Sequence, residues 1–443
     1  MKIQLSDHFT YQRLLHFCLP SIVMMIFTSI YGVVDGLFVS NFVGKIPFAA
    51  INLVMPFIMI LGGFGFMIGT GGSALIAKTL GEGNHKLANR YFSMLIIMTV
   101  ILGFFLTTIG IVFARRVSIL LGATDVMLDD CVIYLRTVLL FISPFMLQNV
   151  FQSFLVTAQK PHAGLIVTII AGLTNMSLDA LFIVVFRWGV AGAALATGIS
   201  QCIGGLLPLI LFLGKNDSLL HLVPTRLEWR PFFLSCTNGM SELMGNISAS
   251  IVSMLYNFQL LNYAGENGIA AYGVLMYVQF IFIAVFFGYT IGVGPVIGYH
   301  YGAGNHAELK NLLRKSLKLN IITGISMTIL ANLFAGVLSR IFVGYDPELY
   351  AMTKSAFHIF ALSFLVCGIN IFASAFFTAL NNGLVSAVIS FLRTLVFQVG
   401  SVLILPVFLG LTGIWLSNTF ADLMAMLISI IFLAAMRKRY HYA

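Results

Sequence analysis

Two aspartates in strongly apolar stretches are the residues of this chain best suited to chemistry. Asp35 lies in the segment YGVVDG and Asp179 in the segment TNMSLD. An acidic side chain inside a membrane span is costly and usually serves a function. Asn175 precedes Asp179 by four residues, on the same face of a helix, and Thr197 lies in the next apolar stretch. At 1.5 Å per residue, Asp35, Asp179 and Thr197 are each roughly 8–12 Å from the outer ends of their segments, so they can converge.

Two carboxylates that share a pocket of low dielectric constant cannot both be ionised cheaply. Either one of them binds a proton or a cation lies between them. Asn175 and Thr197 would add neutral oxygens, and a backbone carbonyl near Gly192 could add another, which suits a small hard cation such as Na⁺. The residues leave the proton site and the Na⁺ site open as alternatives. In a third interpretation, both aspartates are structurally hydrogen-bonded or face the outer water.

Three further charges lie in apolar stretches of the second half of the chain: Glu242, Arg393 and Asp422. Glu242 and Arg393 both lie about 13 Å above the cytoplasmic boundary by the same rise per residue. We expect a structural ion pair between Glu242 and Arg393, or between Arg393 and Asp422, without a role in transport. His300 and His306 have no second ligand at a metal-binding spacing, so we expect no metal site beyond the Na⁺ alternative.

The elements that must position these residues are membrane helices. The chain is 59% hydrophobic and 9% charged, whereas a soluble domain carries about 25% charged residues. Apolar runs of about 20 residues, which span a bilayer as a helix, recur along the chain. We predict twelve spans, at 14–40, 48–79, 92–113, 128–159, 163–187, 190–214, 233–261, 268–300, 316–338, 352–380, 384–408 and 412–436. A membrane β-barrel would instead show alternating segments of about ten residues.

The two halves of the chain repeat each other at a constant offset of 221 residues. The loop GEGNH at 81–85 returns as GAGNH at 302–306, and Gly189 returns as Gly410. Because six spans return the chain to its starting side, the two copies have the same orientation, as in a parallel repeat. We therefore predict an all-α integral membrane protein with twelve transmembrane helices in two six-helix lobes. The expected divisions are an N-lobe at 1–214, a cytoplasmic linker at 215–232 and a C-lobe at 233–443.

The repeat also supplies an internal control for the polar residues. The positions that match Asp35, Asn175, Asp179 and Thr197 hold Tyr256, Val396, Gly400 and Asn418. The scaffold glycines are kept between the halves, whereas this acidic and amide set is not. The fold therefore does not require the set, which indicates a task located in the N-lobe.

The basic residues predict the orientation in the membrane. If the N-terminus is cytoplasmic, sixteen of the 24 Lys and Arg residues fall in inner segments. This is the positive-inside pattern, and it predicts a multi-pass protein of the plasma (inner) membrane with both termini in the cytoplasm. It also accounts for the net charge of +9 without nucleic acid. The outer segments hold few basic residues, chiefly Lys45, Arg115, Arg116, Arg187 and Arg340.

Several motifs, taken in order, resemble the multidrug and toxic compound extrusion (MATE) transporters. They are LP at 19–20, DGLFV at 35–39, GGSAL at 71–75, GEGN at 81–84, NxxxDxLFI from Asn175, and GVAGAALAT at 189–197. The resemblance covers about residues 10–440. It implies a V-shaped pair of six-helix lobes and a secondary active antiporter. Such a protein exports lipophilic or cationic compounds (multidrug efflux) in exchange for H⁺ or Na⁺.

The resemblance also implies roles for individual residues. The coupling site for the proton or cation falls on Asp35, Asn175, Asp179, Thr197, Tyr31, Asn149 and Gln152. Pro20 is implied as a hinge at which the first helix bends, and a proline inside a helix removes one backbone hydrogen bond. One branch of the family also uses carboxylates in spans 7 and 10. Because 352–380 contains no Asp or Glu, the chain is closer to the branch that relies on the N-lobe site.

Other functions fit the residues less well. The main alternative is a flippase for a lipid-linked precursor from the same superfamily. Such proteins typically have fourteen spans and several cavity arginines, whereas this chain has twelve predicted spans and Arg393 is almost alone. A major-facilitator-type transporter would carry a GDRG-type loop after span 2, which 79–90 lacks. No nucleophile or His/Asp cluster suggests an enzyme, and a channel would not need a one-sided acidic site. We expect a monomer without a cofactor, whose partners are small-molecule lipophilic or cationic substrates and membrane lipid.

Overall fold

The computed structural model describes residues 3–214 and 217–442, and every regular element in these ranges is a helix. The first half consists of α1 (Tyr11–Phe42), α2 (Lys45–Gly81), α3 (His85–Leu120), α4 (Leu128–Leu139), α5 (Ile142–Thr157), α6 (Pro161–Asp179), the π-helical turn η1 (Ala180–Val185) and α7 (Gly189–Leu213). The second half consists of α8 (Trp229–Asn238), α9 (Met240–Gly302), α10 (His306–Val343), α11 (Pro347–Phe360), the 3₁₀ turn η2 (Ala361–Ser363), α12 (Phe364–Ala379), α13 (Gly383–Phe391), the π-helical turn η3 (Leu392–Phe397), α14 (Gln398–Leu409), α15 (Leu411–Ala435) and α16 (Arg437–Tyr440).

These helices form the twelve predicted spans. Within the described ranges, ten helices are long and apolar enough to cross a membrane, and α4 with α5, bent by 57°, makes an eleventh span. The 63-residue α9 contains two spans, because Gly265 interrupts its helical backbone with φ 62°. Only glycine adopts this conformation at little cost. Gly44, the repeat partner of Gly265, likewise has a positive φ, of 121°.

Two of the expected ranges, 92–113 and 316–338, are too short. α3 begins at His85 and α10 at His306, so these helices begin about two and three turns, respectively, before their apolar runs. The polar ends remain helical because the repeat-related residues Asn84 and Asn305 accept hydrogen bonds from backbone N–H groups of the first turns. Such N-caps satisfy donors that the helix itself leaves open. Hydropathy detects the apolar run but not the helix beyond it.

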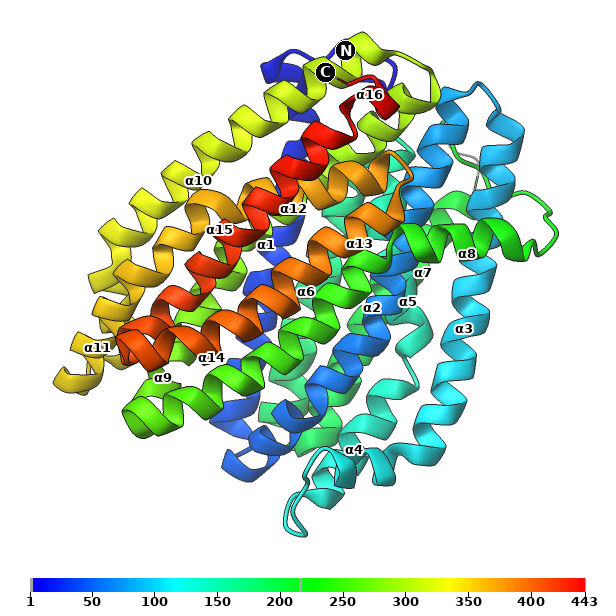
Figure 1. Ribbon diagram of the computed structural model, residues 1–443. Coiled ribbons are helices and arrows are strands. Elements are labelled where there is room, and N and C mark those ends of the chain that lie inside the picture. Colours follow the sequence, from blue (N-terminus) through cyan, green and yellow to red (C-terminus); the bar gives the residue numbers. More distant parts are fainter. Residues whose placement is uncertain (1–2, 215–216, 443) are drawn as a thin grey trace.

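The two lobes contact each other closely near the end of the molecule that carries both chain termini, which we call the terminal end (Figure 1). Gly81 of α2 packs on the backbone of α9 so tightly that a Cβ there would lie 2.0 Å from the carbonyl oxygen of Tyr299. A Cβ on Gly302 would lie 2.0 Å from the carbonyl oxygen of Lys78. Gly302 and Tyr299 are the repeat partners of Gly81 and Lys78, so the two contacts are related by the internal symmetry.

A second pair of contacts follows the same rule. A Cβ on Gly71 of α2 would lie 1.9 Å from the carbonyl oxygen of Ser235 and 2.6 Å from the backbone nitrogen of Gly239. Its repeat partner Gly292 lies against Cys18 of α1, which is the repeat partner of Gly239. Small residues therefore let the lobes approach through their backbones, as is common between membrane helices.

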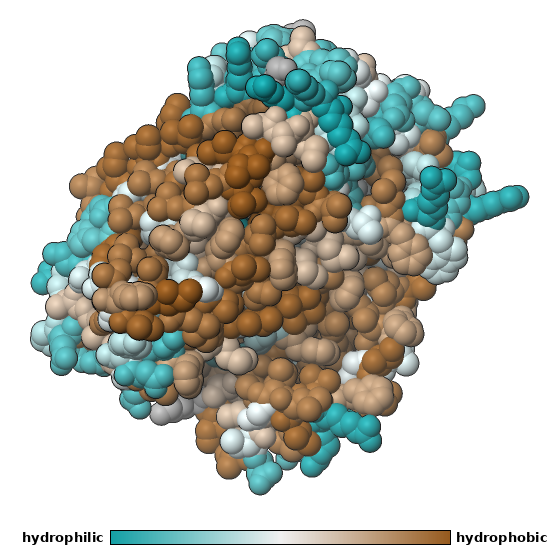
Figure 2. All heavy atoms as spheres, in the orientation of Figure 1, coloured by the Kyte–Doolittle hydropathy of each residue, from teal (hydrophilic) through white to brown (hydrophobic). Residues whose placement is uncertain are grey.

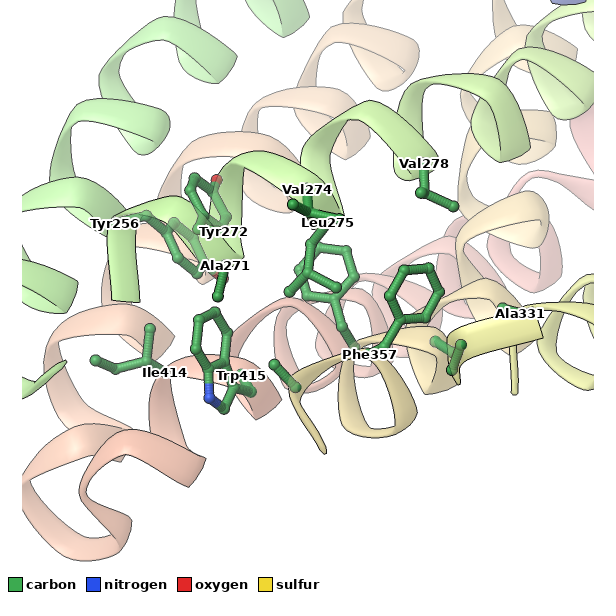
Figure 3. Packing of buried hydrophobic residues seen from close by; sticks show 14 of the residues in the cluster. Tyr256, Ala271, Tyr272, Val274, Leu275, Val278, Ala331, Phe357, Ile414 and Trp415 are labelled. Atoms are coloured by element: carbon green, nitrogen blue, oxygen red, sulfur yellow. The ribbon is translucent and has the colours of Figure 1, made fainter. Parts of the chain in front are cut away.

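Each lobe has its own apolar core. The C-lobe core gathers α9, α10, α11 and α15 around residues such as Leu275, Phe357 and Trp415 (Figure 3). The surface of the molecule shows a broad hydrophobic belt between more hydrophilic ends (Figure 2). Such a belt is what a chain needs when its middle is solvated by lipid.

Of the expected linker, residues 217–228 contain no helix, whereas 229–232 form the start of α8. Residues 217–228 cross α3, where the N–H of His221 donates to Asn89 (2.9 Å) and the N–H of Val223 donates to Ser93 (2.8 Å). Glu228 forms an ion pair with Arg90 at 2.9 Å. The start of the expected linker, 215–216, lies outside the described residues, and the division of the chain at this segment stays a prediction.

Candidate functional site

α1 and α6 bring the two aspartates of the N-lobe together. The side chain of Asp35 lies beside those of Asp179 and Asn175. The approach of the helices depends on Gly172 of α6, where a Cβ would lie 2.5 Å from the ring of Phe27 on α1. Asp179 and Asn175 are almost completely buried, at 0% and 2% exposure.

The cluster presents oxygen atoms without hydrogen-bond partners. Among the described residues, these buried oxygens are Oδ1 of Asp35, both carboxylate oxygens of Asp179, Oδ1 of Asn175 and Oγ1 of Thr197. The great majority of buried polar atoms in proteins have a hydrogen-bond partner. A set of converging, unpaired oxygens is therefore suited to a group that supplies positive charge or a proton. Both a Na⁺ ion and a proton shared by the carboxylates meet this need.

Tyr134 of α4 belongs to the same cluster, and the sequence reasoning missed it. Its side chain is 2% exposed and lies beside Thr197, Asp35 and Asp179. A tyrosine in an apolar segment carries no large cost and so attracts no attention in the sequence. Its only signal is a polar tip on the otherwise apolar buried face of α4.

The other expected site residues lie around the cluster rather than in it. Tyr31, one turn before Asp35, interacts with Gln148 of α5. Gln148 and Gln152 line a cavity of about 10 Å³, which has room for about one water molecule. Asn149 instead donates from its amide to the carbonyl oxygen of Gly62 at 3.0 Å. The structure therefore places Asn149 at the junction of α2 and α5, where it holds the two helices together.

Pro20 lies within α1, which continues as a helix on both sides of it. The neighbouring residues are in contact with the other lobe: a Cβ on Gly292 would lie 2.9 Å from Cys18, and one on Gly288 would lie 2.4 Å from Ile22. A bend of α1 at Pro20 would therefore act directly on the contact between the lobes.

The matching position of the C-lobe is filled by neutral groups that bond to one another. Tyr256, the repeat partner of Asp35, donates to Gln398 at 3.2 Å, and Gln398 donates to Asn418, the partner of Thr197. The ring of Tyr256 is stacked on that of Tyr272, with centroids 4.9 Å apart (Figure 3). The same place in the scaffold thus holds neutral groups that bond to one another in one lobe, where Nδ2 of Asn418 stays unpaired, and unpaired acidic oxygens in the other.

Of the two ion pairs expected in the C-lobe, the structure forms the one between Arg393 and Asp422. Nε of Arg393 lies 2.7 Å from Oδ1 of Asp422, and Asn370 donates to the same aspartate. The pair between Glu242 and Arg393 is not formed, because the side chain of Arg393 on η3 is directed to α15. Within the described residues, Glu242 of α9 has no ion-pair partner.

Comparison with known proteins gives a consistent result. The family model MatE matches the chain twice, over residues 20–181 and 243–404. The chain is 25% identical over 436 residues to the "Multidrug export protein MepA" of Staphylococcus haemolyticus (strain JCSC1435), covering 97% of this chain and 94% of that protein. A solved structure described as "Crystal structure of MATE in complex with MaL6" has a TM-score of 0.93 at 21% identity, with 98% of both chains covered. A second, described as the "Outward-facing conformation of a multidrug resistance MATE family transporter of the MOP superfamily", has a TM-score of 0.92 at 21% identity, again with 98% of both chains covered.

Proposed function

We propose that this chain, which belongs to the MatE family of membrane transporters, is a secondary active antiporter that exports lipophilic or cationic compounds in exchange for H⁺ or Na⁺. The family fixes the class of protein, and the multidrug export proteins it resembles in sequence support the class of substrate. The coupling ion, the residues that bind it and the orientation in the membrane are parts of the proposal.

One observation carries the proposal: among the described residues, the unpaired buried carboxylate oxygens belong to Asp35 and Asp179, and the unpaired oxygens of Asn175 and Thr197 lie in the same lobe. A transporter that couples two fluxes needs a group whose occupancy changes the relative free energy of two conformations. Two adjacent carboxylates do this, because losing their proton or cation leaves repelling charges in a medium of low dielectric constant. The neutral C-lobe network has no comparable capacity to change charge.

The helix that carries Asp35 also carries the contact to the other lobe. Cys18 and Ile22 on α1 touch the C-lobe, and Asp35 lies at the opposite end of the same helix. In the proposed cycle, an ion from outside binds between Asp35 and Asp179 and favours the state that releases substrate outward. Loss of the ion on the inside favours return, and differential binding between these states couples the fluxes.

The proposal is tested with the full chain in proteoliposomes, by following a fluorescent lipophilic cation while a pH gradient and a Na⁺ gradient are imposed separately. We expect transport under one of them, and a loss of about tenfold or more in Asp35→Asn and Asp179→Asn, as expected for a coupling free energy of 1–3 kcal/mol. The matched control is Asp129→Asn, because Asp129 is an exposed carboxylate at the start of α4. This variant should transport normally.

Normal ion-driven efflux by both correctly folded aspartate variants would overturn the site assignment. Absence of transport under both gradients would instead favour a flippase for a lipid-linked precursor, which is the next substrate class to test. One observation argues against the flippase alternative. Arg393, the cavity arginine such a protein would use for a phosphate, is already paired with Asp422.

A further inference from the structure

We propose that a groove between α10 and α11, on the outer surface of the C-lobe, binds the headgroup of an anionic phospholipid. The groove has a volume of about 810 Å³, within the range of pockets that hold small ligands. It lies far from the aspartate cluster of the N-lobe, so the proposal is independent of the coupling site.

Two stripes of residues at four-residue spacing form the walls. Asn332, Gly336 and Arg340 follow one another on one face of α10, and Tyr350, Lys354 and His358 do the same on α11. Residues four apart lie above one another on a helix, so the two stripes face each other along the groove. Leu333, Val337 and Ile341 complete the lining, and all three are exposed at the surface.

Gly336 makes the groove possible. A Cβ there would lie 3.5 Å from the hydroxyl of Tyr350 and 3.7 Å from Cε of Lys354. These α11 side chains therefore lie across the glycine, and a larger residue would fill the space between the helices.

The groove carries positive charge that would suit an anion. Arg340 and Lys354 are exposed and, in the part of the chain that the structure describes, neither forms an ion pair. His358 lies at the far end, where its Nδ1 is 2.7 Å from Oδ1 of Asn332. Asn332 donates its own amide to the carbonyl of Thr328, so its oxygen faces the histidine and the Nδ1–H is the donor. No carboxylate is among the lining residues, and nearby Asp346 instead caps the first turn of α11.

The internal repeat again shows that the scaffold does not require these residues. The N-lobe positions that match Arg340, Lys354 and His358 are Ile119, Ile133 and Thr137. The matching helices, α3 and α4, carry Arg115, Arg116 and Arg136, none of which matches a basic residue of the groove. The basic set therefore reflects something bound on the C-lobe surface and not the needs of the fold.

The position of the groove favours a lipid over a soluble partner. It lies where α10 ends and α11 begins, away from the chain termini and beside the hydrophobic belt, where hydrophilic side chains gather (Figures 1 and 2). In the proposed orientation this is the outer boundary, where basic residues are otherwise scarce under the positive-inside rule. Exposed leucine, valine and isoleucine suit acyl chains, while Arg340 and Lys354 suit a phosphate.

The test uses the full chain, purified in an uncharged detergent, with phosphatidylglycerol and phosphatidylcholine as probes. Native mass spectrometry and thermal unfolding measure binding of each lipid. We expect phosphatidylglycerol to bind and to stabilise the protein. In the double variant Arg340→Gln with Lys354→Gln, the affinity for this lipid should fall by about fivefold for each charge removed. The matched control is Arg115→Gln with Arg116→Gln, which removes two exposed charges from the corresponding end of α3 and should leave binding unchanged.

A second variant separates loss of binding from loss of folding. Gly336→Leu keeps every charge but fills the groove, and we expect it to lose phosphatidylglycerol binding while the protein still unfolds cooperatively. The proposal is overturned by equal binding of the two lipids, by equal losses in the control pair, or by a folded Gly336→Leu that binds as well as the parent. Equal stabilisation by inorganic phosphate would also overturn it, because the site would then accept a free anion without a lipid.

Discussion

At the scale of single residues, the proposed coupling site differs from the matching place in the other lobe in which buried polar atoms have hydrogen-bond partners. The N-lobe brings five buried oxygens together without a hydrogen-bond partner among the described residues. The C-lobe fills the corresponding place with Tyr256, Gln398 and Asn418, which bond to each other. An unpaired buried polar group costs about 1–3 kcal/mol, and the proposed proton or cation would offset this cost during part of the cycle.

Tyr134 gives the sharpest test of this idea, because it touches the cluster without carrying charge. Tyr134→Phe removes only the hydroxyl, which lies beside Thr197 and the two aspartates, and the buried ring keeps its packing. We expect normal yield and thermal stability, together with a shift of about fivefold in the ion concentration that gives half-maximal efflux, equivalent to about 1 kcal/mol, the net size of one hydrogen bond that the hydroxyl would donate to an unpaired oxygen of the cluster. Efflux measured across a series of pH and Na⁺ values checks this.

A suitable control is Tyr277→Phe, because Tyr277 lies on α9 with its ring stacked on Phe342, far along the chain from the cluster. If Tyr134→Phe and Tyr277→Phe show the same ion dependence as the parent, Tyr134 is only a packing residue of α4.

The sequence predicts the charged members of the cluster better than the neutral ones. Asp35 and Asp179 stand out because an acid in an apolar helix is costly, and the constant repeat offset shows that the scaffold can do without them. Tyr134 and Gln148 leave no such signal, since tyrosine and glutamine are tolerated in many membrane helices. Asn149 shows the converse: its type suits the site, but its amide donates to the carbonyl oxygen of Gly62, and only the packing of α2 on α5 reveals that.

At the scale of elements, the chain start does more than precede the first helix. Leu5 and Phe9 are fully buried, and the N–H of Phe9 donates to Glu308 of α10 at 3.0 Å. His8 binds the other carboxylate oxygen of Glu308 at 2.6 Å, and Asn311 donates to the carbonyl of Phe9. We call residues 3–10 the strap, because they fasten the start of α1, an N-lobe helix, to a C-lobe helix.

Phe9→Ala tests whether the strap holds the terminal end closed. The ring packs edge-on against Phe17 and His300, and removing a buried phenylalanine costs about 3–5 kcal/mol. We expect the strap to detach while the lobes stay folded, which hydrogen exchange would show as faster exchange confined to residues 3–20 and the start of α10. Unchanged exchange in these segments would mean that the strap contributes little to closure.

Hydropathy could not have predicted the strap, because its sequence is polar on average and too short to show a period. The same limit applies to η1 and η3, the π-helical turns that follow Asp179 and contain Arg393. The sequence predicts which segments are helices, but not where a helix takes up an extra residue. That local change sets the direction of Arg393, and with it the choice of Asp422 over Glu242 as a partner.

At the scale of the whole molecule, two symmetric glycine contacts define the closed state. Gly81 and Gly302 each place an α-carbon against a backbone carbonyl of the opposite lobe. A transporter that alternates its access must separate these surfaces, and contacts through small residues hold helices together without interlocking side chains. The repeat predicted from the sequence explains why the contacts come in related pairs, although their closeness is visible only in the structure.

Gly302→Ala should therefore shift the molecule toward the state that is open at the terminal end. Its Cβ would lie 2.0 Å from the carbonyl oxygen of Lys78, so α2 and α9 must separate before the side chain fits. Spin labels at Lys86 and Lys310, both exposed near the terminal end, report the distance between the lobes in a background without the native cysteines. We expect a larger population at long distances, and a tenfold change in the ratio of the two states corresponds to about 1.4 kcal/mol.

The matched control lies on the same helix. Gly294→Ala adds the same methyl group to α9, but no atom lies within 4 Å of its Cβ, so the distance distribution should equal that of the parent. A distribution unchanged in Gly302→Ala as well would show that the lobes separate by a path that leaves these glycines in place. Gly81 is the repeat partner of Gly302. If the internal symmetry governs the motion, Gly81→Ala and Gly302→Ala should therefore give equal shifts. A shift in only one of the two variants would mean that the lobes move unequally. Unequal movement would agree with a proposed coupling site that lies in the N-lobe and has no acidic counterpart in the C-lobe.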